Sequence, residues 1–385
     1  MKRILAAVTG ILLLGLLPLS AGAATLAEAG KSAVLMDVTT GTVLYEHNSH
    51  EALAPASVTK VMTMLLIMEA VDSGKIALTD TVTASEAAAA KGGSQIYLKV
   101  GETMSVSDML KSIAVSSAND CACAMAEHIC GSESAFVEAM NRRAKELGMQ
   151  DTHFVNCTGL DDDDSAKLHR TSAYDIALMS RELLKNHPTI QKYTTIWMDT
   201  VRNGAFGLSN TNKLIRFYPG ATGLKTGYTA GAGYCLSASA QKEGMELIAV
   251  VMGAKTSQAR NAACKELLDY GFANFAVVAP EPEELPQVAV RLGKQTRVPV
   301  RMAETAGMLI EKSQRSGITT EISLEDSVAA PVVRGQTLGS LSVKSGEQTL
   351  RQIPLVAAED VERLSTGDIF LAVLRRAAMA KEGQE

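Results

Sequence analysis

The stretch from Ala54 to Met68 constrains this chain more than any other. Its second half, from Val61 on, is apolar on nearly every side, which predicts a helix buried in a core. Pro55 suits the first turn of such a helix, and Ser57 and Lys60 would share one of its faces. A serine hydroxyl needs a base to become a nucleophile, and burial lowers the pKa of a lysine far enough for that task.

Further motifs support a catalytic interpretation, which matters because a Ser-x-x-Lys match alone often occurs by chance. Ser117 and Asn119 form a Ser-x-Asn motif at the start of another apolar helical run. Lys225-Thr226-Gly227 lies between stretches that alternate like strands. This trio, in this order, is typical of penicillin-binding proteins and class A β-lactamases. Asn210-Thr211-Asn212 and residues 223–229 extend the similarity beyond the trio. Almost the whole chain after residue 23 resembles the low-molecular-mass penicillin-binding proteins that act as D-alanyl-D-alanine carboxypeptidases.

The resemblance implies a two-step acyl transfer from a peptidoglycan pentapeptide that ends in D-Ala-D-Ala. Ser57 would attack the penultimate carbonyl, and Lys60 would accept its proton. Lys225 would help to hold Lys60 neutral, because like charges disfavour one another. Ser117 would relay the proton to the leaving D-Ala, and Asn119 would hold both Lys60 and the substrate amide. Trimming the stem in this way controls cross-linking of the cell wall.

Other residues of the implied site would bind the substrate. Lys225 and Thr226 would hold the terminal carboxylate. Gly227 would leave an edge strand bare, so that an extended substrate can lie against it. The backbone N–H groups of Ser57 and Tyr228 would stabilise the oxyanion. By the same resemblance, β-lactam antibiotics would be covalent inhibitors, and no cofactor is expected.

The order of the predicted elements indicates an α/β fold. A hairpin over 32–46 comes first, helices follow, and strands return after Lys225. This order predicts an antiparallel sheet with helices packed around it, in a penicillin-binding/β-lactamase-like domain that spans residues 24–276 and closes with a helix over 257–275.

Composition changes after Phe275. The stretch 279–286 is rich in proline and acidic residues, which is typical of a domain boundary. Short alternating segments then predict a small all-β domain over 285–360. In the tail, 365–380, apolar positions share one helical face. The pattern fits a helix lying on a membrane surface and one docked on its own domain equally well, and the family resemblance favours the membrane.

The N-terminus has the pattern of a secretion signal. Two basic residues precede an apolar run from Ile4 to Leu19, and small residues at 21–23 offer a cleavage site. The run is short for a membrane span and contains Pro18. We expect residues 1–23 to be removed and the mature protein to work outside the cytoplasm, peripheral on the outer face of the cytoplasmic membrane.

Composition argues against several other functions. The net charge is −5 and no basic patch interleaves with aromatics, so nucleic-acid binding is not expected. The aspartates at 161–164 lack the alternation of a calcium loop, and no histidine pattern suits zinc. His169 is interpreted as structural. The cysteines are interpreted as small buried residues rather than disulfides or metal ligands: Cys121, Cys123, Cys130, Cys157, Cys235 and Cys264.

Three other functions stay open. A β-lactamase shares the trio and the fold, but class A enzymes deacylate with a separate glutamate, and none stands out between Asn119 and Lys225. A non-catalytic wall-binding scaffold would not need the motif residues, which are all present. Endopeptidase action on cross-links is compatible with the sequence. The peptidoglycan chemotype, a vegetative or sporulation role, the oligomeric state and the role of the β domain are not determined by the sequence.

Overall fold

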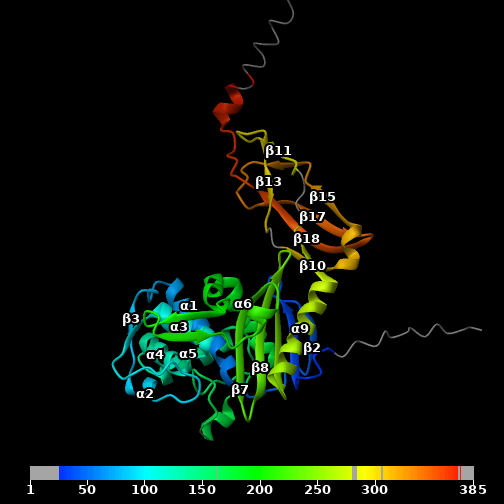
Figure 1. Cartoon of the computed structure of the whole chain (residues 1–385). Coiled ribbons are helices and arrows are strands. Elements are labelled where there is room, and N and C mark those ends of the chain that lie inside the picture. Colours follow the sequence, from blue (N-terminus) through cyan, green and yellow to red (C-terminus); the bar gives the residue numbers. More distant parts are fainter. Residues whose placement is uncertain (1–25, 163, 280–283, 305–306, 372, 374–385) are drawn as a thin grey trace, which may run out of the picture.

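The computed structural model describes residues 26–162, 164–279, 284–304, 307–371 and 373. A large domain of helices and strands is followed by a small β domain that projects from it (Figure 1). The predicted fold class is confirmed: helices surround an antiparallel sheet, and an all-β domain comes after them. The predicted leader lies outside the described residues.

A five-stranded antiparallel sheet forms the centre of the large domain, in the order β2-β1-β9-β8-β7. Its strands are β1 Ser32–Asp37, β2 Val43–His47, β7 Ala221–Thr229, β8 Gly233–Lys242 and β9 Met245–Ala254. The predicted hairpin is β1–β2. Among the strands of the described ranges, β7 has a neighbour on one side only, so its other edge is free to pair with an extended ligand.

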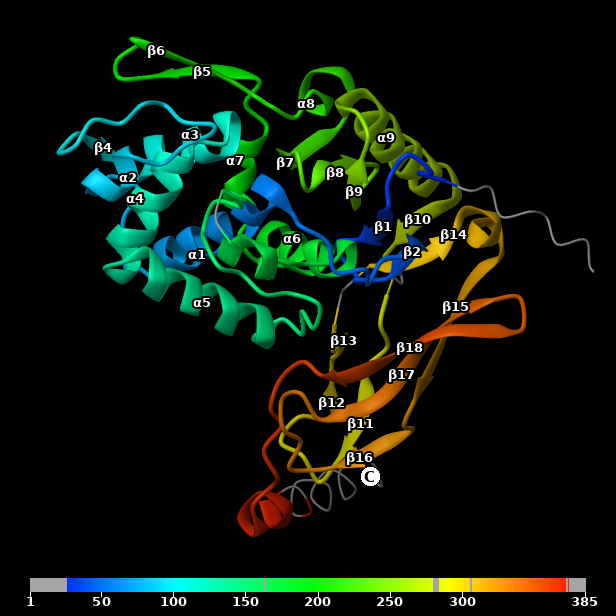
Figure 2. The ribbon, with the colours of Figure 1, turned by 90° about the horizontal axis from the view of Figure 1, so that it is seen from below.

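Helices cover both faces of this sheet (Figure 2). On one face lies α9, Ser257–Asn274, which buries Leu267 and Leu268 in a core shared with the sheet. The other face meets a larger core built around α1, which is buried along most of its length, as predicted. The helices on that side are α1 Lys60–Asp72, α3 Val106–Ser116, α4 Asn119–Cys130, α5 Glu133–Glu146 and α6 Ala173–Asn186.

Side-chain caps fix where several of these helices begin. Ser105, Ser132 and Ser172 each accept a hydrogen bond from a backbone N–H in the first turn of α3, α5 and α6. Shorter elements of the large domain lie between them: η1 Ala56–Thr59, β3 Thr81–Thr83, α2 Glu86–Ala89, β4 Thr103–Ser105, η2 Asp164–Leu168, η3 Pro188–Ile190, α7 Gln191–Thr194, β5 Met198–Val201, β6 Phe206–Ser209 and α8 Leu214–Phe217.

The small domain consists of short β-sheets around two apolar clusters. One sheet has the order β12-β11-β16 and another the order β13-β18-β17-β15. The elements are β11 Val288–Arg291, β12 Arg297–Val298, β13 Val300–Met302, η4 Lys312–Gly317, β15 Ile318–Leu324, β16 Ser327–Ala329, β17 Thr337–Ser345 and β18 Gln348–Ala357. Strands β12 and β13 are separated at Pro299, which lacks the N–H that a ladder needs.

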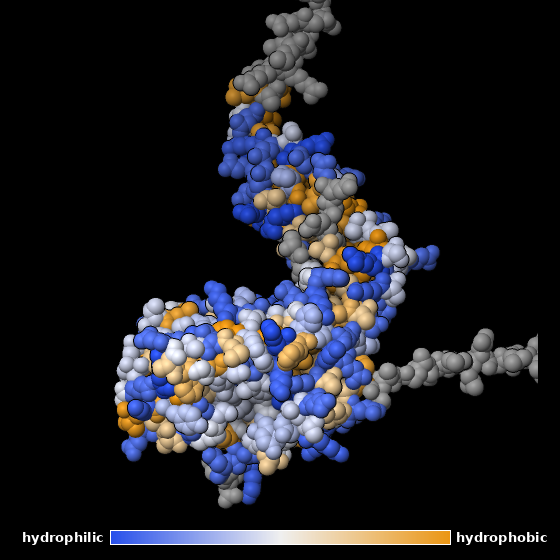
Figure 3. All heavy atoms as spheres, viewed as in Figure 1, coloured by the Kyte–Doolittle hydropathy of each residue, from blue (hydrophilic) through white to orange (hydrophobic). Residues whose placement is uncertain are grey.

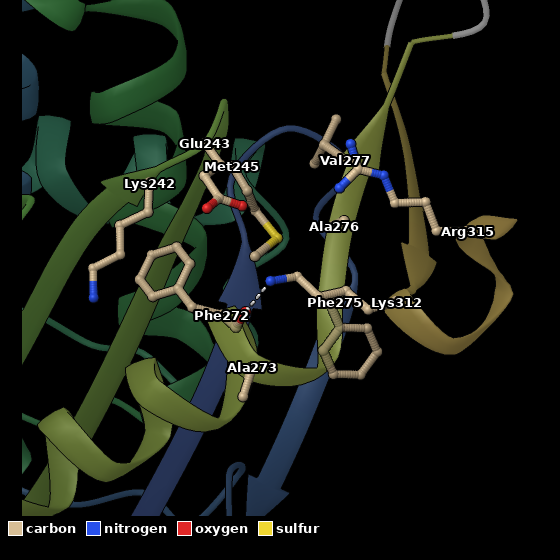
Figure 4. A pocket seen from close by; sticks show the side chains of 10 residues that line it. All are labelled: Lys242, Glu243, Met245, Phe272, Ala273, Phe275, Ala276, Val277, Lys312 and Arg315. Atoms are coloured by element: carbon tan, nitrogen blue, oxygen red, sulfur yellow. Dashed lines mark hydrogen bonds between the residues drawn. The ribbon is translucent and has the colours of Figure 1, made fainter.

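The small domain extends beyond both ends of its predicted range, 285–360, because residues outside that range pair with its strands. Strand β10, Phe275–Val278, follows α9 directly and pairs with β14, Met308–Glu311. At the other end, Gly293 forms a bridge with Arg363. At this junction a cavity of about 310 Å³ is lined by residues of both domains, and Lys312 Nζ donates to the Phe272 carbonyl at 2.8 Å (Figure 4).

The described start of the tail does not settle where its helix lies. Residues 366–371 are helical, and Phe370 and Leu371 are exposed rather than docked on the small domain. Hydrophobic side chains are visible there in Figure 3. Residues 374–385 lie outside the described part. Within that part, none of the helices combines the length and apolar character needed to cross a bilayer.

The cysteine interpretation is largely confirmed. All six are free, five are buried and Cys130 is half-buried. Burial raises the pKa of the Cys235 thiol to about 11 and that of Cys264 to about 12, so both stay protonated and behave as small apolar groups.

Candidate active site

The predicted nucleophile and base lie side by side where η1 meets α1. Lys60 is fully buried, and its Nζ donates to Ser57 Oγ at 3.0 Å and to the Thr158 carbonyl at 2.7 Å. Ser57 itself is partly exposed and can meet a ligand. The pair thus has the distance and the dry surroundings that activation of a serine requires.

Burial is the main reason that Lys60 can act as a base. It lowers the pKa of the ammonium to about 7, while Cys157 and Asp120 act in the opposite direction. Lys225 is also buried, and burial and then the charge of Lys60 hold its pKa well below the usual range. The charge of Lys60 thus disfavours that of Lys225, whereas at Lys60 itself burial alone lowers the pKa, and the expected help from Lys225 stays a prediction.

This pKa predicts the pH dependence of acylation. Lys60 must be neutral to accept the Ser57 proton, so the second-order rate of acylation by benzylpenicillin should fall roughly ten-fold per unit at pH values well below 7 and level off above about 8. Stopped-flow acylation rates between pH 5 and 9 measure this. A rate that stays flat from pH 5 to 8 would show that Lys60 is not the base.

The third motif lies on the free-edge strand β7. Lys225 Nζ donates to the Thr226 carbonyl at 2.9 Å, and Thr226 Oγ1 donates to Thr211 Oγ1 at 2.6 Å. The role expected for Gly227 needs correction. A Cβ there would lie 2.7 Å from the Pro55 carbonyl oxygen and 3.0 Å from Ser57 N. The glycine therefore makes room for residues 55–57, the turn that carries the nucleophile (the nucleophile turn), rather than for substrate.

The Ser-x-Asn motif lies at the junction of α3 and α4. Ser117 ends α3 in the left-handed backbone region, with φ 64°, a conformation that often marks functional sites. Its hydroxyl is buried and has no hydrogen-bond partner among the described residues, so neither lysine holds it in the free protein. Asn119 also departs from the prediction. Its Nδ2 donates to the Gly92 carbonyl at 2.7 Å and not to Lys60, and its buried Oδ1 has no partner within the part of the chain that the structure describes.

Tyr228, the last predicted site residue, lies on β7 one position beyond Gly227. Its side chain is 55% exposed, and its ring stacks on Tyr234 with centroids 4.2 Å apart. His169, expected to be structural, is buried, and its Nε2 lies 2.8 Å from Thr59 Oγ1 beside the nucleophile turn. Burial lowers the pKa of His169 to about 4, which keeps the ring neutral.

Sequence reasoning missed the loop that holds Lys60 in place. Glu133 Oε1 accepts hydrogen bonds from the N–H and the thiol of Cys157, both at 3.2 Å, and Lys91 Nζ lies 2.6 Å from Glu133 Oε2. Burial opposes ionisation of Glu133, but the hydrogen bond from Lys91 lowers its pKa overall. This ion pair fixes the loop whose Thr158 carbonyl accepts from Lys60. No short motif could have revealed it, because the partners are far apart in the chain.

Among the described residues, one cluster has side chains suited to a metal ion. The ligand atoms of Glu69, Glu182 and His187 lie within 4.8 Å of one another. Arg143 bonds to both carboxylates at 2.7 Å, so the cluster already contains a cation. None of these residues belongs to the site around Ser57.

Comparison with known proteins identifies the family. The family described as D-alanyl-D-alanine carboxypeptidase matches residues 20–256, and the penicillin-binding protein 5 C-terminal domain matches residues 279–363. This chain belongs to the D-alanyl-D-alanine carboxypeptidase family. A Bacillus subtilis relative, D-alanyl-D-alanine carboxypeptidase DacF, is 45% identical over 98% of each chain. The Escherichia coli carboxypeptidase DacC is 35% identical over 86% of this chain and 83% of its own.

Solved structures of this family show the same architecture. Penicillin-binding protein 5 from Haemophilus influenzae superposes with a TM-score of 0.74 at 31% identity, covering 87% of this chain and 98% of that one. Penicillin-binding protein D2 from Listeria monocytogenes, in an ampicillin-bound form, covers 63% of this chain and 98% of its own with a TM-score of 0.58 at 32% identity. The resemblance drawn from the motifs is therefore confirmed.

Proposed function

We propose that this serine D-Ala-D-Ala carboxypeptidase uses Ser57 as its nucleophile and Lys60 as the base that activates it. The single observation that carries this assignment is the 3.0 Å contact between a buried Lys60 Nζ and Ser57 Oγ. The substrate is the peptidoglycan stem that ends in D-Ala-D-Ala, as the names of the relatives indicate.

The reaction proceeds through an ester. Neutral Lys60 takes the proton of Ser57, and Oγ bonds to the penultimate carbonyl carbon. The carbon–nitrogen bond then breaks, and the proton passes to the amine of the leaving D-Ala. Ser117, whose hydroxyl has no competing partner in the described ranges, is suited to relay it. Water attacks the ester next, Lys60 again serves as base, and the trimmed stem leaves Ser57 free.

The remaining motif residues would hold the substrate. The terminal carboxylate would bind at Lys225 and Thr226 on the free edge of β7. The buried Oδ1 of Asn119 would accept a substrate N–H, which would satisfy an otherwise unpaired polar atom. The oxyanion would lie between the N–H groups of Ser57 and Tyr228, each worth roughly 3 kcal/mol in the transition state.

Intact mass spectrometry with benzylpenicillin tests this assignment. The protein without residues 1–23 should gain one penicilloyl adduct, located on Ser57 by peptide mapping, and the adduct should persist for minutes. The same preparation should release D-Ala from a model peptide. An adduct that clears within seconds while penicillin is consumed would indicate a β-lactamase, and no adduct at all would favour a non-catalytic scaffold.

The structure adds an argument against the β-lactamase. Glu133, which lies in the segment where a deacylating glutamate would be expected, is held by Lys91 and Cys157 and forms no hydrogen bond with Ser57 or Lys60 among the described residues. Slow deacylation is the expected consequence, because class A enzymes deacylate with a glutamate that activates water.

We also propose that the mature protein lies on the outer face of the cytoplasmic membrane. The leader pattern over 1–23 and the exposed Phe370 and Leu371 at the start of the tail helix support this. Deleting the chain from Gly367 onward should move the penicillin-labelled protein from the membrane fraction to the soluble fraction of cells, with labelling of Ser57 intact. Membrane association that survives the deletion would contradict the anchor.

A further inference from the structure

The cavity at the junction of the two domains is large enough to hold a small molecule. Its volume of about 310 Å³ lies at the lower end of the range that is usual for ligand pockets. Its wall comes from the β8–β9 turn, the end of α9, strand β10 and η4, and it shares no lining residue with the site around Ser57 (Figure 4). We propose that this junction cavity binds a small amphipathic anion, an apolar ring or chain with one acidic head group.

Apolar side chains form much of the cavity wall. Met245 is buried, whereas Phe272, Phe275 and Val277 stay half-buried although they lie between two domains. Strand β10 pairs with β14 over its whole length, which holds this part of the wall in place. An apolar group in the cavity would remove the remaining surface of these side chains from water, which favours binding of an apolar body.

Two cationic side chains extend over the cavity from the small domain. A 3₁₀ helix has three residues per turn, so Lys312 and Arg315 share one face of η4. Both point toward the β8–β9 turn (Figure 4). Lys312 Nζ is fixed at 2.8 Å by the neutral Phe272 carbonyl, and the Arg315 guanidinium forms no hydrogen bond or ion pair with any residue that the structure describes. An ammonium and a guanidinium placed in this way are suited to hold a carboxylate, phosphate or sulfonate.

The charges along the wall favour an anion over a cation. Lys242 adds a third positive charge, with its Nζ 4.8 Å from the ring centroid of Phe272 and 3.0 Å from the Tyr218 hydroxyl. Glu243 is the single acidic residue among those that line the cavity. Three cations therefore face one carboxylate, and an acidic head group would balance part of the excess positive charge.

Two fluorescent probes with the same rings test the inference on the protein without residues 1–23. They are 8-anilinonaphthalene-1-sulfonate and N-phenyl-1-naphthylamine, which lacks the sulfonate. The sulfonate probe should bind with a Kd on the order of tens of micromolar, roughly ten-fold or more below that of the neutral probe. Equal Kd values within two-fold would overturn the proposal.

Competition tests whether both parts of the ligand matter. 1-Naphthoate, which carries a carboxylate on an apolar ring system, should displace the sulfonate probe. Inorganic phosphate at the same concentration should not, because it has no apolar body. Equal displacement by phosphate would indicate a plain anion site and would contradict the amphipathic ligand.

Variants assign probe binding to the cavity. Arg315→Gln and Lys312→Gln should each raise the Kd of the sulfonate probe roughly ten-fold and leave that of the neutral probe unchanged. Ala276→Trp, which fills the cavity from β10, should abolish binding of both. Arg291→Gln, at an exposed arginine of β11 outside the cavity, is the matched control and should change neither Kd.

Penicillin labelling and thermal unfolding separate loss of the site from loss of the fold. Each variant should label at Ser57 and unfold like the unmodified protein, because the cavity and the active site share no residue. If Ala276→Trp fails to fold, the exposed Arg315 decides alone. A sulfonate Kd that stays within two-fold in Arg315→Gln would show that the probe binds elsewhere, and the junction cavity would be rejected as the site.

Discussion

Replacing Ser57 by alanine is expected to abolish penicillin labelling and to reduce D-Ala release by about 10⁴-fold or more. Ser57 Oγ is the atom that Lys60 Nζ contacts at 3.0 Å, and without it no ester can form. Intact mass measures the adduct, and release of D-Ala from a model peptide measures turnover.

Ser73→Ala is a suitable control, because Ser73 caps the other end of α1 and lies away from the site. It should retain labelling and turnover close to those of the unmodified protein. Persistent labelling of Ser57→Ala at an unchanged rate would mean that another residue is acylated. A cellular phenotype that survives Ser57→Ala would instead point to the scaffold.

Replacing Gly159 by alanine is expected to have the largest effect on the structure around the base. Gly159 has φ +82°, and a Cβ there would lie 1.8 Å from the Ala56 carbonyl oxygen. The backbone at Gly159 or at Ala56 would have to move to relieve this clash. Displacing this loop would pull the Thr158 carbonyl away from Lys60. We expect a loss of about 3 kcal/mol or more in the free energy of unfolding and a fall of roughly 100-fold in the acylation rate.

Gly148→Ala separates the effect of backbone strain at a positive φ from the effect of the close contact with Ala56. Gly148 also has a positive φ, +75°, but a Cβ there would meet nothing within 4 Å. Backbone strain alone should cost about 1 kcal/mol at this position and leave acylation unchanged. Denaturant unfolding of the two variants gives the comparison. Equal destabilisation would show that the close contact with Ala56 relaxes cheaply.

The elements of the large domain could be predicted because local signals agree with the tertiary structure. Helices α3 and α6 carry serine caps and apolar faces, and the β1–β2 hairpin is local in the chain. The small β domain was harder to predict. Its junction strand β10 pairs with β14 some thirty residues away, a partner that no local pattern specifies.

The motif residues of the site were found from spacing, but two of their contacts were not. Asn119 points its amide at Gly92 rather than at Lys60, because the 92–94 segment packs against the start of α4. Gly227 is required by the close approach of β7 to the nucleophile turn. Both contacts join segments distant in sequence, as does the Glu133 pair that fixes the Thr158 loop.

The free edge of β7 has a consequence for how the protein could evade an inhibitor. A strand edge recognises the backbone of any extended ligand and is largely indifferent to side chains. Substituting exposed side chains along β7 therefore changes little of what a rigid peptide mimic meets. Escape would require the strand itself to move. The strand cannot move closer to the nucleophile turn at Gly227, because this residue already lies against Pro55 and Ser57. Tolerance of an inhibitor would thus come at the expense of the substrate that uses the same edge.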